Sequence, residues 1–217
     1  MTRMRMKRHI PERMERCHER WFDDPAQNKG KWREVCGVAE DTPIFLELGC
    51  GKGKFCTETA LANPDVLYIA VERDKSVILA AIEKAHNQEI PNLYFINCDV
   101  NIIEDLFEEH EVNRIYINFC DPWNRRKKPK RRLTYRDFLV RYKRLMKPGS
   151  EIRFKTDNDD LFDFSLEEFE ACGFKLTELT RDLHNSEYDA ANVRTEFEQK
   201  FADEGIPIKR VVAVMQE

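Results

Sequence analysis

The chain has 217 residues, of which 41% are hydrophobic and 35% are charged. This length suits one sizeable α/β domain and excludes two ordinary domains, while the composition is typical of a soluble protein with a heavily charged surface. No apolar stretch is as long as a membrane span, and the first residues lack the apolar segment of a signal peptide. We therefore expect a cytoplasmic protein with no membrane partner.

Charge is distributed unevenly along the chain. The formal net charge is −4, yet residues 1–33 carry ten Lys or Arg against five Asp or Glu. Residues 125–132 hold seven basic residues in eight positions. Seven cysteines without a Cys-x-x-Cys pair suggest neither a disulfide framework nor a zinc site, so we expect no metal.

The composition divides the chain into a basic N-terminal arm, residues 1–33, and a domain over residues 34–217. Two interpretations of the arm stay open. Its Arg and Lys side chains suit a flexible segment that binds the phosphates of a nucleic acid. The alternative is a solvated leader with one short helix near residues 12–22.

A glycine-rich turn follows the first clear strand pattern. The apolar run Ile44 to Leu48, which includes Glu47, leads directly into Gly49, Gly51 and Gly53. An apolar run, closely spaced glycines and then a helical pattern predict a buried strand that turns into a helix, where a cofactor can bind. The spacing is not Gly-x-Gly-x-x-Gly, which weighs against an oxidoreductase.

The second strand pattern, residues 66–71, ends at Glu72, nineteen positions after Gly53. A carboxylate at this place in a nucleotide-binding α/β unit can accept hydrogen bonds from both ribose hydroxyls. A helix over 75–88 and a third strand over 93–96 then lead to Asp99. Asp99 could accept from an adenine amino group or could form an Asx turn at the start of the next helix.

Alternating strands and helices predict a parallel sheet with helices on both faces and ligands beyond the carboxyl ends of the strands. The fourth strand, residues 115–119, is followed by Asp121, Trp123 and the basic run. An acceptor for a base edge, a stacking surface and a phosphate-binding cluster together predict a nucleic-acid partner. The expected RNA phosphate contacts are Arg126, Lys127, Lys128, Lys130, Arg131 and Arg132.

Three further strands complete a predicted seven-stranded sheet. Thr134-x-x-Asp137 is close to a capping box and predicts a helix to about residue 146. Strands follow over 150–156, with one partly wet face, over 174–181 and over 208–215. Composition alone assigns no role to the charged segment that contains Thr195 to Glu198.

With these motifs placed, the sequence resembles the bacterial tRNA (guanine-N7-)-methyltransferase family of class I S-adenosylmethionine-dependent methyltransferases. The stretch 46–53 resembles the first loop of class I enzymes in general. Two others are specific to the family: 117–123 with its basic tail, and 154–158 with the later 195–198. The resemblance covers residue 42 to the C-terminus.

This resemblance implies a Rossmann-like fold and methyl transfer from S-adenosylmethionine to N7 of a guanosine in the variable loop of tRNA. It implies that the cofactor is bound by Glu47, Gly49, Gly51, Gly53, Glu72, Asp99 and Asp121, and that Asp121 is also catalytic. It further implies that the substrate is bound by Arg125, Asp157, Thr195, Glu196, Phe197 and Glu198.

The chain departs from the family pattern in places. Arg125 replaces a frequent Lys, which keeps the charge but not the geometry. Asn124 replaces a Pro, and Phe197 a common Tyr. A methyltransferase acting on another nucleobase and a non-catalytic RNA-binding subunit are the alternatives, although the glycines and carboxylates are intact. The role of Asp121, charge stabilisation or guanine recognition, stays open.

Overall fold

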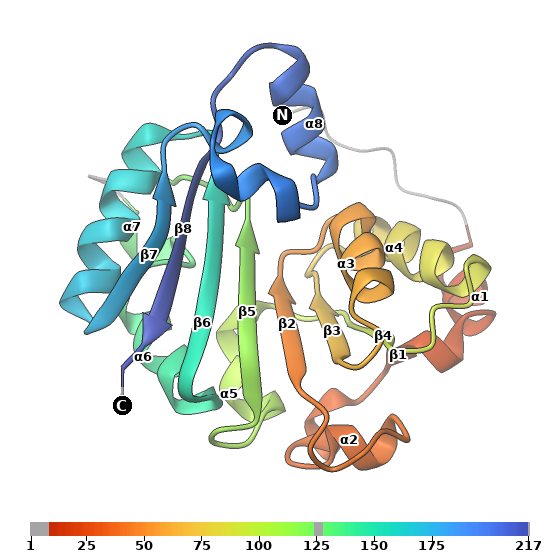
Figure 1. The fold of residues 1–217 in the computed structure, drawn as a ribbon. Helices are drawn as coiled ribbons and strands as arrows, with labels where there is room; N and C mark the ends of the chain where they lie inside the picture. Colours follow the sequence, from red (N-terminus) through yellow and green to blue (C-terminus); the bar gives the residue numbers. More distant parts are fainter. Residues whose placement is uncertain (1–8, 124–127, 217) are drawn as a thin grey trace.

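Eight strands form one central sheet (Figure 1), in a computed structural model that describes residues 9–123 and 128–216. In sheet order they are β1 (Trp21–Phe22), β4 (Leu93–Ile96), β3 (Leu67–Val71), β2 (Ile44–Leu48), β5 (Val112–Asn118), β6 (Met146–Thr156), β8 (Lys209–Met215) and β7 (Phe174–Thr180). β8 is antiparallel to both β6 and β7, and all other neighbours are parallel. The mostly parallel α/β sheet predicted from the sequence is confirmed.

The central strands are buried on both faces. In β2, Ile44, Leu46 and Leu48 belong to one core cluster, while Phe45 belongs to a second cluster on the other face. Every residue of β2 is buried as a result. Burial of both faces explains why this strand reads as a continuous apolar run instead of an alternating one.

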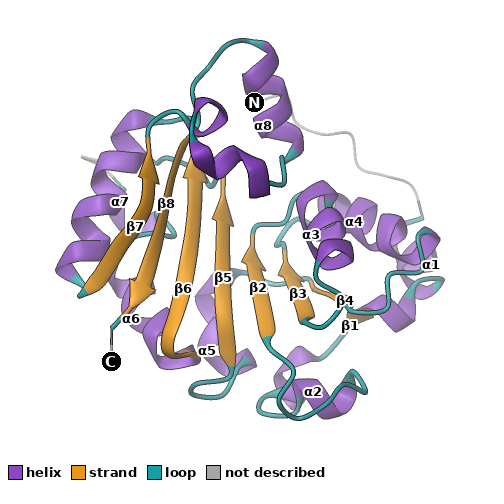
Figure 2. Cartoon of the chain, viewed as in Figure 1, coloured by secondary structure: helices purple, strands orange, loops and turns teal. Residues whose placement is uncertain are grey.

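Helices cover both faces of the sheet (Figure 2). The cluster that includes Phe45 also contains residues of α1 (Ile10–Glu15), α3 (Lys54–Ala62) and α4 (Lys75–Asn87). The other cluster contains residues of α2 (Trp32–Val35), α5 (Ile103–Leu106), α6 (Arg136–Leu145) and α7 (Asp159–Ala171). The short α8 (Glu196–Asp203) lies instead beyond the carboxyl ends of β5 and β6, at the top of Figure 1.

The sheet has one strand more than the seven predicted, because residues 21–22 pair in parallel with β4 at its edge. A two-residue strand is too short to show any periodicity in sequence. The surrounding segment belongs to residues 1–33, the expected basic N-terminal arm, of which residues 1–8 lie outside the described part. From residue 9 it packs on the domain: Met14 and Trp32 are buried, and Arg13 forms a two-point ion pair with Glu83 of α4.

Candidate active site

A cavity of about 830 Å³ lies at the carboxyl ends of β2, β3, β4 and β5. Its walls come from the glycine turn, from the ends of these strands, from the segment after β5 and from the start of α8. This is the edge where the sequence pattern placed the ligand site. The predicted residues that line it are Glu47, Gly49, Gly51, Glu72, Asp99, Asp121, Lys130, Arg131, Thr195, Glu196 and Phe197.

The glycines of the turn have different surroundings. A Cβ added at Gly49 or Gly51 would meet no atom within 4 Å, and both residues line the cavity. A Cβ at Gly53 would lie 2.5 Å from the Cβ of Ala81, so this glycine allows α3 and α4 to pack closely. Gly53 is not part of the cavity lining. Gly49 and Gly51 thus keep space open for a ligand, whereas Gly53 is needed for helix packing.

Glu47 is a buried carboxyl group in the floor of the cavity. It is 1% exposed and accepts hydrogen bonds from Asn118 Nδ2 at 3.1 Å and from the Tyr68 hydroxyl at 3.3 Å. Burial raises the pKa of Glu47 to about 7, although these hydrogen bonds and the charge of Lys155 lower it in part. The other amide atom of Asn118, Oδ1, is buried and has no donor within the described residues. The floor therefore offers one carboxyl group and one unused acceptor.

Two further carboxylates end β3 and β4. Glu72 accepts from the backbone N–H of Gly51 at 3.3 Å and from that of Asp74 at 2.9 Å, which ties the strand end to the glycine turn. Asp99 accepts from the backbone N–H of Asn101 at 2.9 Å and from its side-chain amide at 2.6 Å. Asp99 thus forms the Asx turn that was one of its two interpretations, and it also lines the cavity.

Asp121 lies after β5 and also lines the cavity. Its side chain is 42% exposed, and its Oδ2 is 3.7 Å from Arg73 Nη2. Arg73 lines the same cavity. Arg73 and Asn118 were not among the predicted site residues: Arg73 is marked in the sequence only by its position just after a strand, and Asn118 also by its place in the family-specific stretch 117–123.

Two side chains of the basic run lie beside Trp123. The Lys128 ammonium is 5.6 Å and the Arg131 guanidinium 4.8 Å from the centre of the indole ring, and Lys128, Lys130 and Arg131 are exposed. Arg132 differs from the expected phosphate contact, because it is 2% exposed and donates to the Trp123 carbonyl at 2.7 Å. The predicted contacts Arg125, Arg126 and Lys127 lie outside the described residues.

The segment from Thr195 to Glu198 begins α8 above the cavity. Glu196 and Phe197 are exposed, whereas the side chain of Glu198 is fully buried beneath them. Neither Glu198 nor Asp157 lines the cavity. Asp157 is half-buried just after β6, and its carbonyl accepts from Lys209. The expected substrate residues are therefore only partly brought together.

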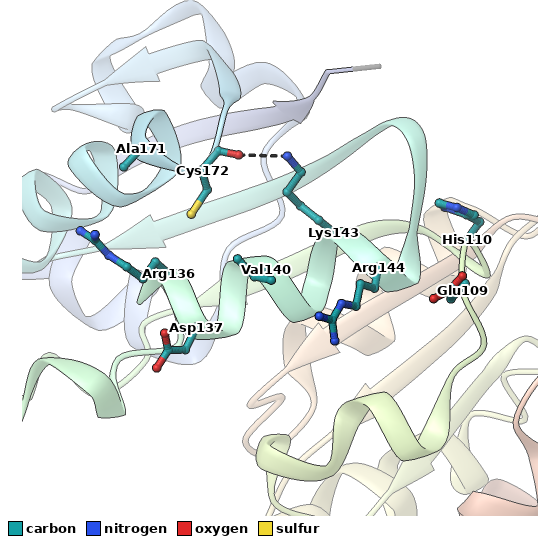
Figure 3. A pocket seen from close by; sticks show the side chains of 9 residues that line it. All are labelled: Glu109, His110, Arg136, Asp137, Val140, Lys143, Arg144, Ala171 and Cys172. Carbon is teal, nitrogen blue, oxygen red and sulfur yellow. Dashed lines mark hydrogen bonds between the residues drawn. The ribbon is translucent and has the colours of Figure 1, made fainter.

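A second hollow, of about 670 Å³, lies along α6 and contains none of the predicted site residues (Figure 3). Its lining mixes Arg136, Lys143 and Arg144 with Asp137 and Glu109. Among the described residues, no group of three His, Cys, Asp or Glu side chains is arranged to hold a metal ion. None of the helices in residues 9–123 and 128–216 has the length and apolar character needed to cross a membrane.

Solved methyltransferase structures share this fold. The 16S rRNA methyltransferase KamB superposes with a TM-score of 0.62 at 16% identity, covering 81% of this chain and 88% of that one. The 16S rRNA (adenine(1408)-N(1))-methyltransferase of Catenulisporales acidiphilia gives a TM-score of 0.55 at 17% identity, covering 89% and 92%. The class I methyltransferase fold predicted from the sequence is confirmed.

Sequence comparison is more specific. A family model described as "Putative methyltransferase" matches residues 41–211. The tRNA (guanine-N(7)-)-methyltransferase of Lachnoclostridium phytofermentans is 48% identical over 194 residues, which cover 89% of this chain and 90% of that protein. The enzyme of the same name from Bacillus subtilis is 44% identical over 205 residues, covering 89% and 95%. The chain belongs to the tRNA (guanine-N(7)-)-methyltransferase family.

Proposed function

We propose that this protein transfers a methyl group from S-adenosylmethionine to N7 of a guanosine in tRNA, with the variable loop as the target. One observation carries the proposal: a cavity with a carboxylate floor, beside a glycine turn, opens under a basic and aromatic rim. A cationic cofactor suits the floor, and a polyanionic substrate suits the rim. Because tRNA is the substrate, we place the activity in the cytoplasm.

The residues of the cavity fit the cofactor. S-adenosylmethionine supplies a methyl group bonded to a positively charged sulfur. The unused Asn118 Oδ1, together with Glu47, suits the cofactor's ammonium group. Glu72, at the end of β3, suits the ribose hydroxyls, and Asp99 retains acceptor capacity for the adenine amino group, since a carboxylate has about four lone-pair sites.

Methyl transfer to N7 requires the protein mainly to position the two ligands and to stabilise the positive charge that moves between them. N7 of guanine has an in-plane lone pair and no proton, so no general base is needed, and alignment of the two ligands lowers most of the barrier. Positive charge moves from the sulfur to the purine during transfer. Asp121, three residues after β5 and half-exposed in the cavity wall, stabilises that charge.

The basic and aromatic rim of the cavity binds the RNA. Lys128, Lys130 and Arg131 are exposed beside Trp123, so they can neutralise phosphates near the target nucleotide. Phe197 is 61% exposed at the start of α8 and lines the same cavity. Together Trp123 and Phe197 provide aromatic surfaces on which an unstacked base can stack.

The decisive experiment compares Asp121→Asn with the wild type in single turnover, at saturating cofactor and tRNA, with the methylated nucleoside mapped by mass spectrometry. Wild type should place 7-methylguanosine in the variable loop. Asp121→Asn should slow transfer about 10²–10³-fold, a typical loss for one preorganised electrostatic group, while binding both ligands.

Asp137→Asn, an exposed carboxylate on α6, is the matched control and should keep the wild-type rate. A methyl group on another atom or base would overturn the proposed reaction. An unchanged rate in Asp121→Asn would remove Asp121 from catalysis and leave the reaction standing.

A further inference from the structure

Lys155 is a buried cation that the proposed mechanism does not use. It lies near the carboxyl end of β6, and its side chain is 6% exposed. Its ammonium donates to Glu198 Oε2 at 2.7 Å, Asn192 Oδ1 at 2.9 Å and the Val193 carbonyl at 2.9 Å. A lysine ammonium has three donors. All three point to the single segment, residues 192–198, that leads into α8.

Glu198, the partner of Lys155, is fully occupied by donors from the protein. Oε1 accepts from Asn192 Nδ2 at 2.6 Å and contacts His184 Nε2 at 3.1 Å, while Oε2 also accepts from the Thr195 backbone N–H at 3.4 Å. Burial alone would raise the pKa of Glu198, but the charge of Lys155 and these hydrogen bonds lower it. The carboxylate is therefore held charged, with no exposed surface for a substrate.

The pair also fixes how α8 begins. Thr195 accepts from the Glu198 backbone N–H at 2.9 Å, and the two residues form a reciprocal capping box. With Thr195 and Glu198 buried at the two ends of this turn, the residues between them, Glu196 and Phe197, face outward and line the cavity. The buried Lys155–Glu198 pair thus determines that Glu196 and Phe197 are the side chains of this turn that face the cavity.

Lys155 contacts the other two walls of the site as well. Its backbone carbonyl accepts from the Phe119 N–H at 2.9 Å, two residues before Asp121. Its ammonium is 5.0 Å from the ring centre of Phe55, which follows the glycine turn and lines the cavity. Lys155 therefore contacts all three parts of the site: the helix after the glycine turn, the strand end before Asp121 and the segment 192–198.

We propose that the Lys155–Glu198 pair is a positioning device. It holds residues 192–200, which we call the rim segment because they border the same cavity, over the methyl-transfer site. Glu198 then acts through the rim and is not a ligand of the guanosine. The inference rests on the proposed function for its catalytic readout, but the placement of the rim segment can be measured without it.

The test is a double-mutant cycle with Lys155→Met, Glu198→Leu and the double variant. Removing one partner leaves the other as an unpaired buried charge, which can prevent folding. The double variant removes both charges together, so neither is left as an unpaired buried charge. It should stay folded and still bind S-adenosylmethionine, because the residues proposed to bind the cofactor are unchanged.

Two readouts decide the outcome. Single-turnover transfer to tRNA should fall about 10²-fold in the double variant, the cost of a misplacement near 1 Å, and each folded single variant should lose as much as the double. Hydrogen exchange of the backbone amides in residues 195–200 should speed up by at least tenfold. If the single losses multiply instead, Glu198 acts on the substrate independently and the inference is wrong.

A matched control removes another buried carboxylate from an ion pair. Arg136 and Glu168 join α6 to α7 at 2.7 Å, and neither residue lines the site cavity. The double variant Arg136→Met/Glu168→Leu should leave both the transfer rate and the exchange of residues 195–200 unchanged. Equal losses there would reduce the effect to general destabilisation and overturn the inference. Absence of methyl transfer in the wild type would overturn the proposed function alone. Hydrogen exchange would still test whether the Lys155–Glu198 pair holds residues 195–200 in place.

Discussion

Three acidic residues of the cavity, each at or just after the end of a predicted strand, have different environments in the fold. Glu47 is buried in the floor, Glu72 is held by two backbone N–H groups, and Asp121 is 42% exposed. Their positions at strand ends follow from the sequence, because apolar runs mark where buried strands stop. Their burial does not, because it depends on which segments fold over the strand ends.

Glu47→Gln should change the pH dependence of stability. The pKa of Glu47 is raised from 4.5 to about 7, so the folded state keeps its proton where the unfolded chain has lost it. Stability from this group is therefore complete below about pH 4.5 and is lost as the pH rises towards 7, by about 3 kcal/mol in all.

Denaturant unfolding at pH 4.5 and at pH 7.5 measures this effect. The wild type should lose more stability between the two values than Glu47→Gln, which has no carboxyl group to titrate. Glu170→Gln, an exposed site on α7, should behave as the wild type does. Parallel curves for wild type and Glu47→Gln would show that the pKa of Glu47 is not raised.

Short elements show where local sequence rules hold and where tertiary packing overrides them. Thr195 forms the capping box that its spacing to Glu198 allows. Thr134 has a similar spacing to Asp137, yet the helix begins at Arg136 and the Thr134 hydroxyl contacts Ser165 Oγ at 2.7 Å in the core. The pattern is the same, but burial of Thr134 gives its hydroxyl a competing partner.

The same limit explains Arg132 and Glu198. Arg132 belongs to the basic run expected to contact phosphates, Glu198 belongs to a segment that the family resemblance assigned to the substrate, and both are buried. A sequence shows that a cluster is charged, but the direction of one side chain within it is set by neighbours from distant elements. For Arg132 the neighbour is the Trp123 carbonyl, and for Glu198 it is Lys155.

Gly53→Ala should destabilise the protein more than Gly51→Ala. Both residues have a left-handed backbone, with φ of 84° and 58°, so each substitution costs about 1–2 kcal/mol for that reason alone. Only at position 53 does the new Cβ clash with Ala81, at 2.5 Å, which adds about 1–3 kcal/mol of overpacking.

Thermal and urea unfolding compare the two variants, and titration calorimetry measures their affinity for S-adenosylmethionine. Gly51→Ala should lose the larger share of affinity, because its Cβ enters the cavity. Equal stability of the two variants would mean that α3 and α4 can separate at little cost.

At the scale of the whole molecule, charge is segregated. A chain with a net charge of −4 would repel RNA if its charge were uniform, but the exposed cations of the rim lie together at the carboxyl ends of the strands. In sequence, the acidic excess lies outside residues 1–33 and 125–132. Such segregation lets a molecule of negative net charge bind a polyanion at one face.

Replacing Lys128, Lys130 and Arg131 together with Ala should therefore weaken tRNA binding and flatten its salt dependence. Each lost phosphate contact lowers the log–log salt slope by about 0.7–0.9, so the triple variant should lose about 2–3. Fluorescence anisotropy with labelled tRNA over a range of salt concentrations gives the slope.

A triple Ala variant at Arg144, Lys147 and Lys175, near the amino ends of β6 and β7, removes the same charge from the opposite end of the sheet. It should keep the wild-type slope. If both triple variants change the slope equally, net charge and not the rim governs binding.

The short strand β1 matters for what the sheet leaves uncovered. Trp21 and Phe22 pair with Phe95 and Ile96, and the Trp21 indole N–H donates to the Met14 carbonyl at 3.0 Å, which holds the strand in place. At the opposite edge of the sheet, a register shift in the edge strand β7, beside Glu178, interrupts its pairing with β8. Exposed strand edges are templates for pairing between molecules, and bulges or covering segments blunt them. A chain that began after residue 22 would expose the apolar edge of β4, and its first failure would be self-association into aggregates.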